Sequence, residues 1–498
     1  MVFRWNGPRW RAIPCPRVAL LFPLLLLGGA WFSAAQEAEK PVPKPALPSE
    51  TLPVPNPEQA TPQTEQKQSN ADVRTGSVVG EGEESIASRL ASLLVDHQFL
   101  DMEAMLDASD ASADPQSKLP EAKKQLYRGI LANRENKPEE SIRLLAPLVA
   151  KIKPDEHPPE EKMLRKALAE DYLRLGDWAN ANQAYLEYQY RIGGKLSQDE
   201  KDELDLPLSL LPLARLNPPM TVEPGEPFAL PYDRDALGLT DVPVFVDAMS
   251  HDWMLDPTAP FNLICRSTAK EVGLKVSEES ATIHSLTGRP MKVHVTVIPR
   301  LTVGTVTYRN MTAFVFEDAD YYFPVSQYQV RGVLGYPAVS ALGSITVSFQ
   351  SRIEVQPGAK GERLTGGARF FLDGDQVVGA LGKPGDERMY VIDASGQQTY
   401  LTSRYYAEHT ADFADQKMLL LSPPGARRQA TVPAYVADTI ELQVGQTPFA
   451  FHFAQVLTQP LSDAAIDDTY GKLGMDALEG LKSYTFDFRT MRFGITNH

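Results

Sequence analysis

The sequence is poor in cysteine, histidine and positive charge, and each shortage excludes a class of protein. Only Cys15 and Cys265 occur in 498 residues, so no disulfide framework is available and stability must come from packed cores. The eight histidines are scattered without metal-ligand spacing, and we expect no metal and no cofactor. The formal net charge of -15 argues against a nucleic-acid partner, because a phosphate backbone is bound by a basic face.

Long apolar runs are also lacking after the first 35 residues. Within residues 1–35, four arginines precede an apolar run of 15 residues (18–32) and the small-residue sequence Ser33-Ala34-Ala35. This pattern is typical of a signal peptide that is cleaved after Ala35. We expect export to the bacterial periplasm or the extracellular space, with no membrane span in the mature chain. The alternative is an uncleaved anchor, although about 20 residues are needed to span a bilayer.

Residues 36–82 are rich in proline and polar residues. Eight prolines fall between Pro41 and Pro62, and Glu, Gln, Thr and Ser follow them. Such a composition buries too little apolar surface to offset the entropy of ordering, so we expect a disordered linker.

Residues 84–218 show the apolar period of helices. Two segments, 126–149 and 168–191, each predict two helices joined by a short polar turn. The second resembles a tetratricopeptide repeat at its small and aromatic positions, which are Tyr172, Gly176, Trp178, Ala181 and Tyr185. The resemblance implies a concave surface that binds peptides. The other interpretation is a helical bundle that only supports the rest of the chain.

From about residue 219 the period changes to the two-residue alternation of β-strands, and the chain repeats itself. Residues 332–349 align with residues 471–488 with eight identities in 18 positions. Asp256 precedes Gly335 by 79 residues, and Asp393 precedes Gly474 by 81. The two copies therefore hold an aspartate and a glycine at nearly the same spacing.

Each copy resembles a retropepsin-like aspartic protease unit. The first (219–355) does so through LDPTAPFNLI and GVLGYPAVSALG, and the second (389–498) through VIDASGQQTYL and GKLGMDALEGL, with residues 356–388 as a linker. The resemblance implies a multidomain fold of α plus all-β class. In it, tetratricopeptide-like helical hairpins precede two retropepsin-like units that form a pepsin-like pseudo-dimer.

The resemblance also implies a site built from both units. Asp256 and Asp393 are the candidate catalytic pair, in which two carboxyl groups share one proton. The implied supporting residues are those of the aspartate loops, of a flap over the cleft and of the glycine signature: Thr258, Ser395 and Gly396; Ser285, Thr287 and Gly288; Gly335 and Gly474.

Both loops depart from the Asp-Thr-Gly pattern of the family. Pro257 and Ala394 stand where the family has a hydroxyl residue, and a hydroxyl follows one position later at Thr258 and Ser395. We therefore expect a pseudoprotease that binds a peptide or protein ligand. The alternative is an active aspartic endopeptidase. We expect a monomer with an intrachain pair, the alternative being a homodimer in which like units pair.

Overall fold

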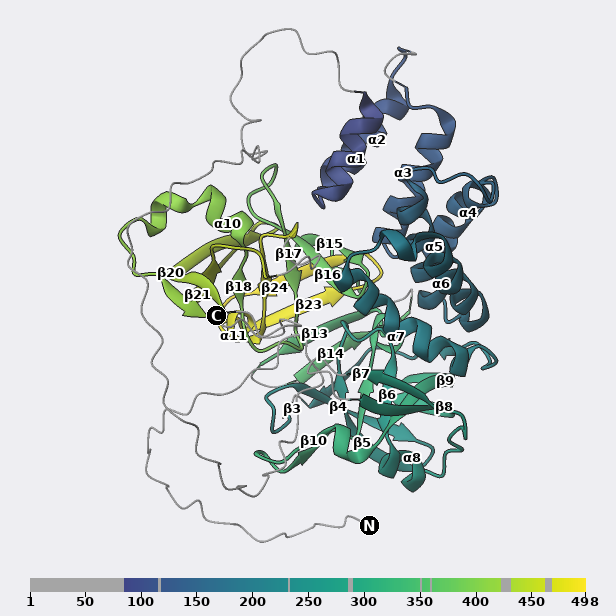
Figure 1. Ribbon diagram of the computed structural model, residues 1–498. Coiled ribbons are helices and arrows are strands. Elements are labelled where there is room, and N and C mark those ends of the chain that lie inside the picture. The colour runs from purple at the N-terminus through teal and green to yellow at the C-terminus, as the bar shows by residue number, and fades with distance from the viewer. Residues whose placement is uncertain are drawn as a thin grey trace, which may run out of the picture.

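The computed structural model describes residues 85–114, 118–231, 233–284, 290–349, 352–358, 361–421, 431–461 and 468–498. A helical N-terminal region is followed by a large β-rich region (Figure 1), as the change of sequence period predicts. The predicted signal peptide and proline-rich linker lie outside the described residues. Within the described ranges, no helix has both the length and the apolar character needed to cross a membrane.

The helical region contains paired helices with polar residues at several starts. Asp177 caps one helix by accepting a hydrogen bond from Asn180 N (3.2 Å), and Ser197 and Glu200 form a reciprocal capping box at another. The helices are α1 (Ile86–Val95), α2 (Phe99–Ala111), α3 (Glu121–Arg134), α4 (Pro138–Val149), α5 (Glu161–Arg174), α6 (Trp178–Ile192), the 3-10 helix η2 (Gly193–Lys195) and α7 (Gln198–Ala214).

The two segments predicted to be helical pairs are helical. Residues 126–149 fall on α3 and α4, and residues 168–191 on α5 and α6. Gly129 lets the first pair approach closely, since a Cβ at this position would lie 2.3 Å from Leu145 Cδ2. The likeness to tetratricopeptide repeats stays a prediction.

The first β region follows α7 and contains one main sheet with strand order β1-β9-β6-β12-β5-β4-β8-β7. Its elements are β1 (Thr221–Glu223), β2 (Phe228–Pro231), β3 (Asp233–Arg234), β4 (Thr240–Val246), β5 (Met249–Leu255), β6 (Asn262–Cys265), α8 (Arg266–Glu271), β7 (Ala281–His284), β8 (Pro290–Val303), β9 (Val306–Phe316), η3 (Asp318–Asp320), β10 (Tyr322–Phe323), β11 (Tyr328–Gln329), β12 (Gly332–Leu334), α9 (Tyr336–Ala341), β13 (Ser344–Ser348) and β14 (Arg352–Gln356).

The second β region has a similar order of elements around its aspartate. They are β15 (Ala368–Asp373), β16 (Gln376–Leu381), β17 (Arg388–Ile392), β18 (Tyr400–Leu401), α10 (Ser403–Glu408), η4 (Thr410–Phe413), β19 (Leu419–Leu421), β20 (Val432–Val444), β21 (Thr447–Leu457), β22 (Gly471–Leu473), α11 (Met475–Leu478), β23 (Ser483–Asp487) and β24 (Arg492–Thr496).

The predicted linker, residues 356–388, contains two strands of this region. β15 pairs with β16 and β24, and β16 pairs with β17. The sequence ARFFLDGDQVVGAL carries the Asp-Gly turn of a hairpin between apolar strands. The linker prediction was therefore wrong over residues 368–381.

The two β regions are joined by strand pairing between β13 and β23. The strands are antiparallel, and Thr346 lies opposite Thr485 with their hydroxyl oxygens 2.8 Å apart. Ile345, Val347 and Phe486 of these strands are buried. The outer neighbours of the pair are β14 and β24, so the sheet continues in a similar order into each region.

The helical region packs on both β regions (Figure 1). Helices α1 to α5 share an apolar cluster with residues of β15, β16 and β17. Asp373, at the end of β15, is half-buried there and pairs with Arg134 (2.9 Å) and His97 (2.5 Å). Helix α7 lies along β7 and β8, where Leu211 and Val293 are fully buried.

Candidate active site

Each candidate aspartate directly follows a strand and makes the same backbone contact. Asp256 comes directly after β5, and Asp393 directly after β17. A parallel strand lies beside each of them, β12 beside β5 and β22 beside β17. The backbone N–H of Asp256 donates to Leu334 O (3.0 Å), and that of Asp393 donates to Leu473 O (2.9 Å). The internal repeat thus places both carboxyl groups by matching backbone contacts.

The two signature glycines are required by close backbone contacts. A Cβ at Gly335 would lie 2.2 Å from Phe261 O, and one at Gly474 would lie 2.7 Å from Gln398 O. Their N–H groups donate to side chains that the sequence analysis did not single out, Asn262 Oδ1 (3.0 Å) and Thr399 Oγ1 (2.9 Å). Both partners occupy the sixth position after their aspartate. This shared position is the sequence feature that could have identified them.

Gly335→Ala should lower the free energy of unfolding by about 3 kcal/mol or more, because the added methyl group must displace backbone. Gly194→Ala is a matched control, since no atom lies within 4 Å of a Cβ built there. We expect a change below about 1 kcal/mol for the control. Urea unfolding of both variants measures the difference, and equal small effects would contradict the close contact.

The Asp256 carboxyl group is held from one side by its own loop. Its Oδ1 accepts hydrogen bonds from Thr258 N (2.8 Å), Thr258 Oγ1 (2.7 Å) and Ala259 N (3.2 Å). Its Oδ2 is buried and has no hydrogen-bond partner among the described residues. Thr258, one position later than the hydroxyl residue of the family pattern, thus supplies two of these three hydrogen bonds.

The Asp393 carboxyl group is held from both sides. Its Oδ1 accepts from Ser395 N (3.2 Å), Ser395 Oγ (2.8 Å) and Gly396 N (2.7 Å). Lys472 donates to its Oδ2, with Nζ 2.9 Å away. Both oxygens of this carboxylate therefore accept hydrogen bonds.

The two loops meet through their hydroxyl groups. Thr258 Oγ1 and Ser395 Oγ lie 3.2 Å apart and form a hydrogen bond between the two β regions. Asp393 lies close enough to Asp256 that its charge raises the pKa of Asp256. The structure thus brings the loop of Asp256 and Thr258 against the loop of Asp393 and Ser395. Thr258 and Ser395 are 137 residues apart in the sequence.

Lys472, which contacts Asp393, is the residue of this site that the sequence did not single out. It lies in β22 opposite Val391, is 4% exposed, and its ammonium group sits 5.7 Å from the centre of the Tyr400 ring. The repeat did contain a signal, since Lys472 aligns with the apolar Val333 of the first copy. A lysine in a short buried strand is rare unless it is paired.

The environment drives the two pKa values apart. Burial raises the pKa of Asp256 to about 6, and the nearby charge of Asp393 adds to this, while the Thr258 hydrogen bonds oppose it. Burial also works to raise the pKa of Asp393, but the charge and hydrogen bond of Lys472 outweigh it and hold that pKa below its ordinary value. Asp393 is thus the ionised member and Asp256 the member that keeps a proton more readily.

Residues just before the two aspartates share apolar clusters with the helical region. Side chains two residues apart on a strand share a face, so Met254 lies on the side of Asp256 and Val391 on the side of Asp393. Met254 belongs to an apolar cluster with α6 and α7, and Val391 to the cluster with α1 to α5. Met254 and Val391 are only 2% and 4% exposed.

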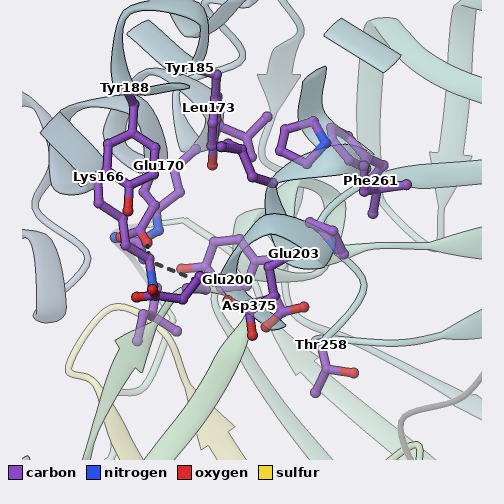
Figure 2. A pocket seen from close by; sticks show the side chains of 18 of the residues that line it. Lys166, Glu170, Leu173, Tyr185, Tyr188, Glu200, Glu203, Thr258, Phe261 and Asp375 are labelled. Atoms are coloured by element: carbon purple, nitrogen blue, oxygen red, sulfur yellow. Dashed lines mark hydrogen bonds and ion pairs between the residues drawn. The ribbon is translucent and has the colours of Figure 1, made fainter. Parts of the chain in front are cut away.

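A cavity of about 190 Å³ remains where the helices meet the Asp256 loop (Figure 2). It is lined by α5, α6, α7, Thr258 to Phe261, the start of α9 and the β15–β16 turn, and is called the junction pocket below. Thr258 connects this pocket to Asp256. The predicted flap residues Ser285, Thr287 and Gly288 lie outside the described residues, between β7 and β8.

The comparisons with known proteins bear on the first β region. The family model described as aspartyl protease matches residues 242–338. A crystal structure of a retropepsin-like aspartic protease from Rickettsia conorii is similar at 17% identity, covering 25% of this chain and 98% of the other, with a TM-score of 0.20. None of the curated proteins compared matches the chain. Residues 242–338, which hold Asp256, its loop and Gly335, are therefore similar to the aspartyl protease family.

Proposed function

We propose that this protein is an exported pseudoprotease of the retropepsin-like type, which binds a peptide or protein segment without cleaving it. The observation that carries the proposal is the buried Lys472, whose ammonium group lies 2.9 Å from Asp393 Oδ2. In the family mechanism, one ionised carboxylate activates a water molecule while the protonated partner polarises the peptide carbonyl. Lys472 interferes with the first of these roles.

The chemical reason is that Asp393 is a poor base. Its Oδ1 already accepts three hydrogen bonds and its Oδ2 accepts one from Lys472, so a water molecule would have to share Oδ2 with the ammonium group of Lys472. The lowered pKa of Asp393 also weakens it as a proton acceptor. The ammonium group of Lys472 takes the place beside Asp393 of the proton that the two carboxyl groups of a working pair share and transfer.

The arrangement of the chain supports a monomer that resembles a pepsin-like pseudo-dimer. Both aspartates come from one chain, and β13 pairs with β23 between the two β regions. The altered loops keep a hydroxyl contact at 3.2 Å, which supports pairing of the two loops within one chain. The predicted leader favours the periplasm or the extracellular space as its location.

The second candidate is an active aspartic endopeptidase. The opposite shifts of the Asp256 and Asp393 pKa values favour it, because a working pair needs one ionised and one protonated carboxyl group. In this case Asp393 would activate water despite Lys472.

A binding experiment with the mature chain (36–498) distinguishes the two. The protein is incubated with a diverse peptide library from acid to neutral pH, and bound peptides are identified by mass spectrometry. We expect them to be recovered intact. Recovery of fragments with wild type, but not with Asp256→Asn or Asp393→Asn, would establish the endopeptidase instead.

A further inference from the structure

We propose that the junction pocket binds a bulky apolar side chain of a peptide whose neighbouring residues are basic. The inference rests on the proposed binding function and names the class of ligand. The pocket lies between α5, α6 and α7 on one side and the loop after Asp256 on the other (Figure 2). An apolar cavity of about 150 Å³ holds benzene, so about 190 Å³ is room for one large side chain.

The interior of the pocket is apolar and aromatic. Tyr185 and Tyr188 of α6, Phe261 of the aspartate loop and Leu204 of α7 line it, and all four are buried. Burying an apolar side chain among such groups is favourable by about 25 cal/mol per Å² of surface removed from water. The interior therefore selects a residue such as phenylalanine or leucine.

The mouth of the pocket is acidic. Asp202 and Glu203 on α7 and Asp375 on the β15–β16 turn line the pocket and are exposed. They come from opposite sides of the junction, so their charges surround whatever enters. Complementary charge guides the approach of a ligand and selects among ligands, which favours basic residues next to the inserted side chain.

The two cations that line the pocket are already engaged in the fold. Arg174 donates to Asn133 O (2.7 Å) and Gly374 O (3.3 Å). Lys166 Nζ lies 3.9 Å from Glu170 Oε1. They therefore stabilise the junction, and the charge of Glu203 also acts on Lys166, whose pKa it helps to raise.

One buried acceptor in the pocket has no hydrogen bond. Glu170 is 5% exposed, and its Oε1 has no hydrogen-bond partner among the described residues. Lys166 Nζ is 3.9 Å from this oxygen, too far for a hydrogen bond, so a donor from a bound peptide would stabilise the complex. Because Thr258 also lines the pocket, a peptide seated there lies beside the aspartate pair.

Fluorescence anisotropy with labelled peptides tests the inference on the mature chain. Three matched probes carry Lys-Phe-Lys, Glu-Phe-Glu or Lys-Ala-Lys between glycines. We expect the first to bind at least about 10-fold more tightly than the other two. The double variant Asp202→Asn, Glu203→Gln should weaken its binding by roughly 3- to 10-fold. Asp205→Asn should not, because this exposed residue of the same helix does not line the pocket.

Leu206→Trp is a second variant, which fills the pocket from the half-buried side of α7. It should abolish the preference for phenylalanine over alanine while circular dichroism shows the fold retained. Equal binding of the basic and acidic probes, or equal effects of the double variant and Asp205→Asn, would overturn the inference and leave the proposed function standing. Cleavage of the probes would overturn the proposed function, but the inference about what the junction pocket binds would stand.

Discussion

Replacing Lys472 with methionine should lower the free energy of unfolding by about 3 to 5 kcal/mol at neutral pH. Methionine keeps most of the side-chain volume, so the loss comes from leaving the Asp393 carboxylate buried without its cation. The loss should shrink at acid pH, where Asp393 takes up a proton in the variant and no longer needs a counter-charge. Urea unfolding at several pH values measures this.

A double-mutant cycle separates the ion pair from other effects of the substitution. Lys472→Met combined with Asp393→Asn should recover much of the lost stability, because neither charge is then left alone. Lys482→Met is the control, since Lys482 is exposed and should change stability by less than about 1 kcal/mol. A loss at Lys472 no larger than that at Lys482 would contradict the role given to the ion pair.

The Asp256→Asn variant should lose less stability than the wild type between acid and neutral pH. The folded pKa of Asp256 is raised from the ordinary 3.8 to about 6, so folding favours the protonated form. Its contribution is fully present below the ordinary pKa and is lost as the pH rises through about 6. A shift of this size corresponds to about 3 kcal/mol.

The comparison of wild type with variant matters, because burial also raises the pKa values of Asp171 and Asp241 to about 7. The contributions of these two residues to the pH dependence of stability are the same in wild type and variant, so they cancel when the two profiles are subtracted. Asp393→Asn should act with the opposite sign, since the lowered pKa of Asp393 gives stability that is present at neutral pH and lost on acidification. Parallel pH profiles for wild type and Asp256→Asn would contradict the protonated state proposed for Asp256.

The local parts of the site could be predicted from the sequence. The repeated spacing of an aspartate and a glycine named Asp256, Asp393, Gly335 and Gly474, because a strand end and a close backbone contact need those residue types at those positions. The hydroxyls of Thr258 and Ser395 followed from the shifted loop pattern. These features depend on residues that are close in sequence or repeated.

The remaining features depend on which elements pack together, and no local pattern specifies that. The apolar period of α7 predicts a buried face but not that this face lies on β7 and β8. Lys472 appears as one polar residue in an apolar strand, and its partner is 79 residues away. The strands β15 and β16 were mistaken for a linker because their family counterparts were not part of the recognised pattern.

The most direct test of the central claim is cleavage by wild-type mature protein at a concentration equal to that of the peptide substrates. Under this condition even a single turnover is detected. We predict that the library stays intact from acid to neutral pH while the protein remains folded, because Lys472 keeps Asp393 from activating water. Cleavage that disappears in both Asp256→Asn and Asp393→Asn would contradict the account and show that the pair is catalytic.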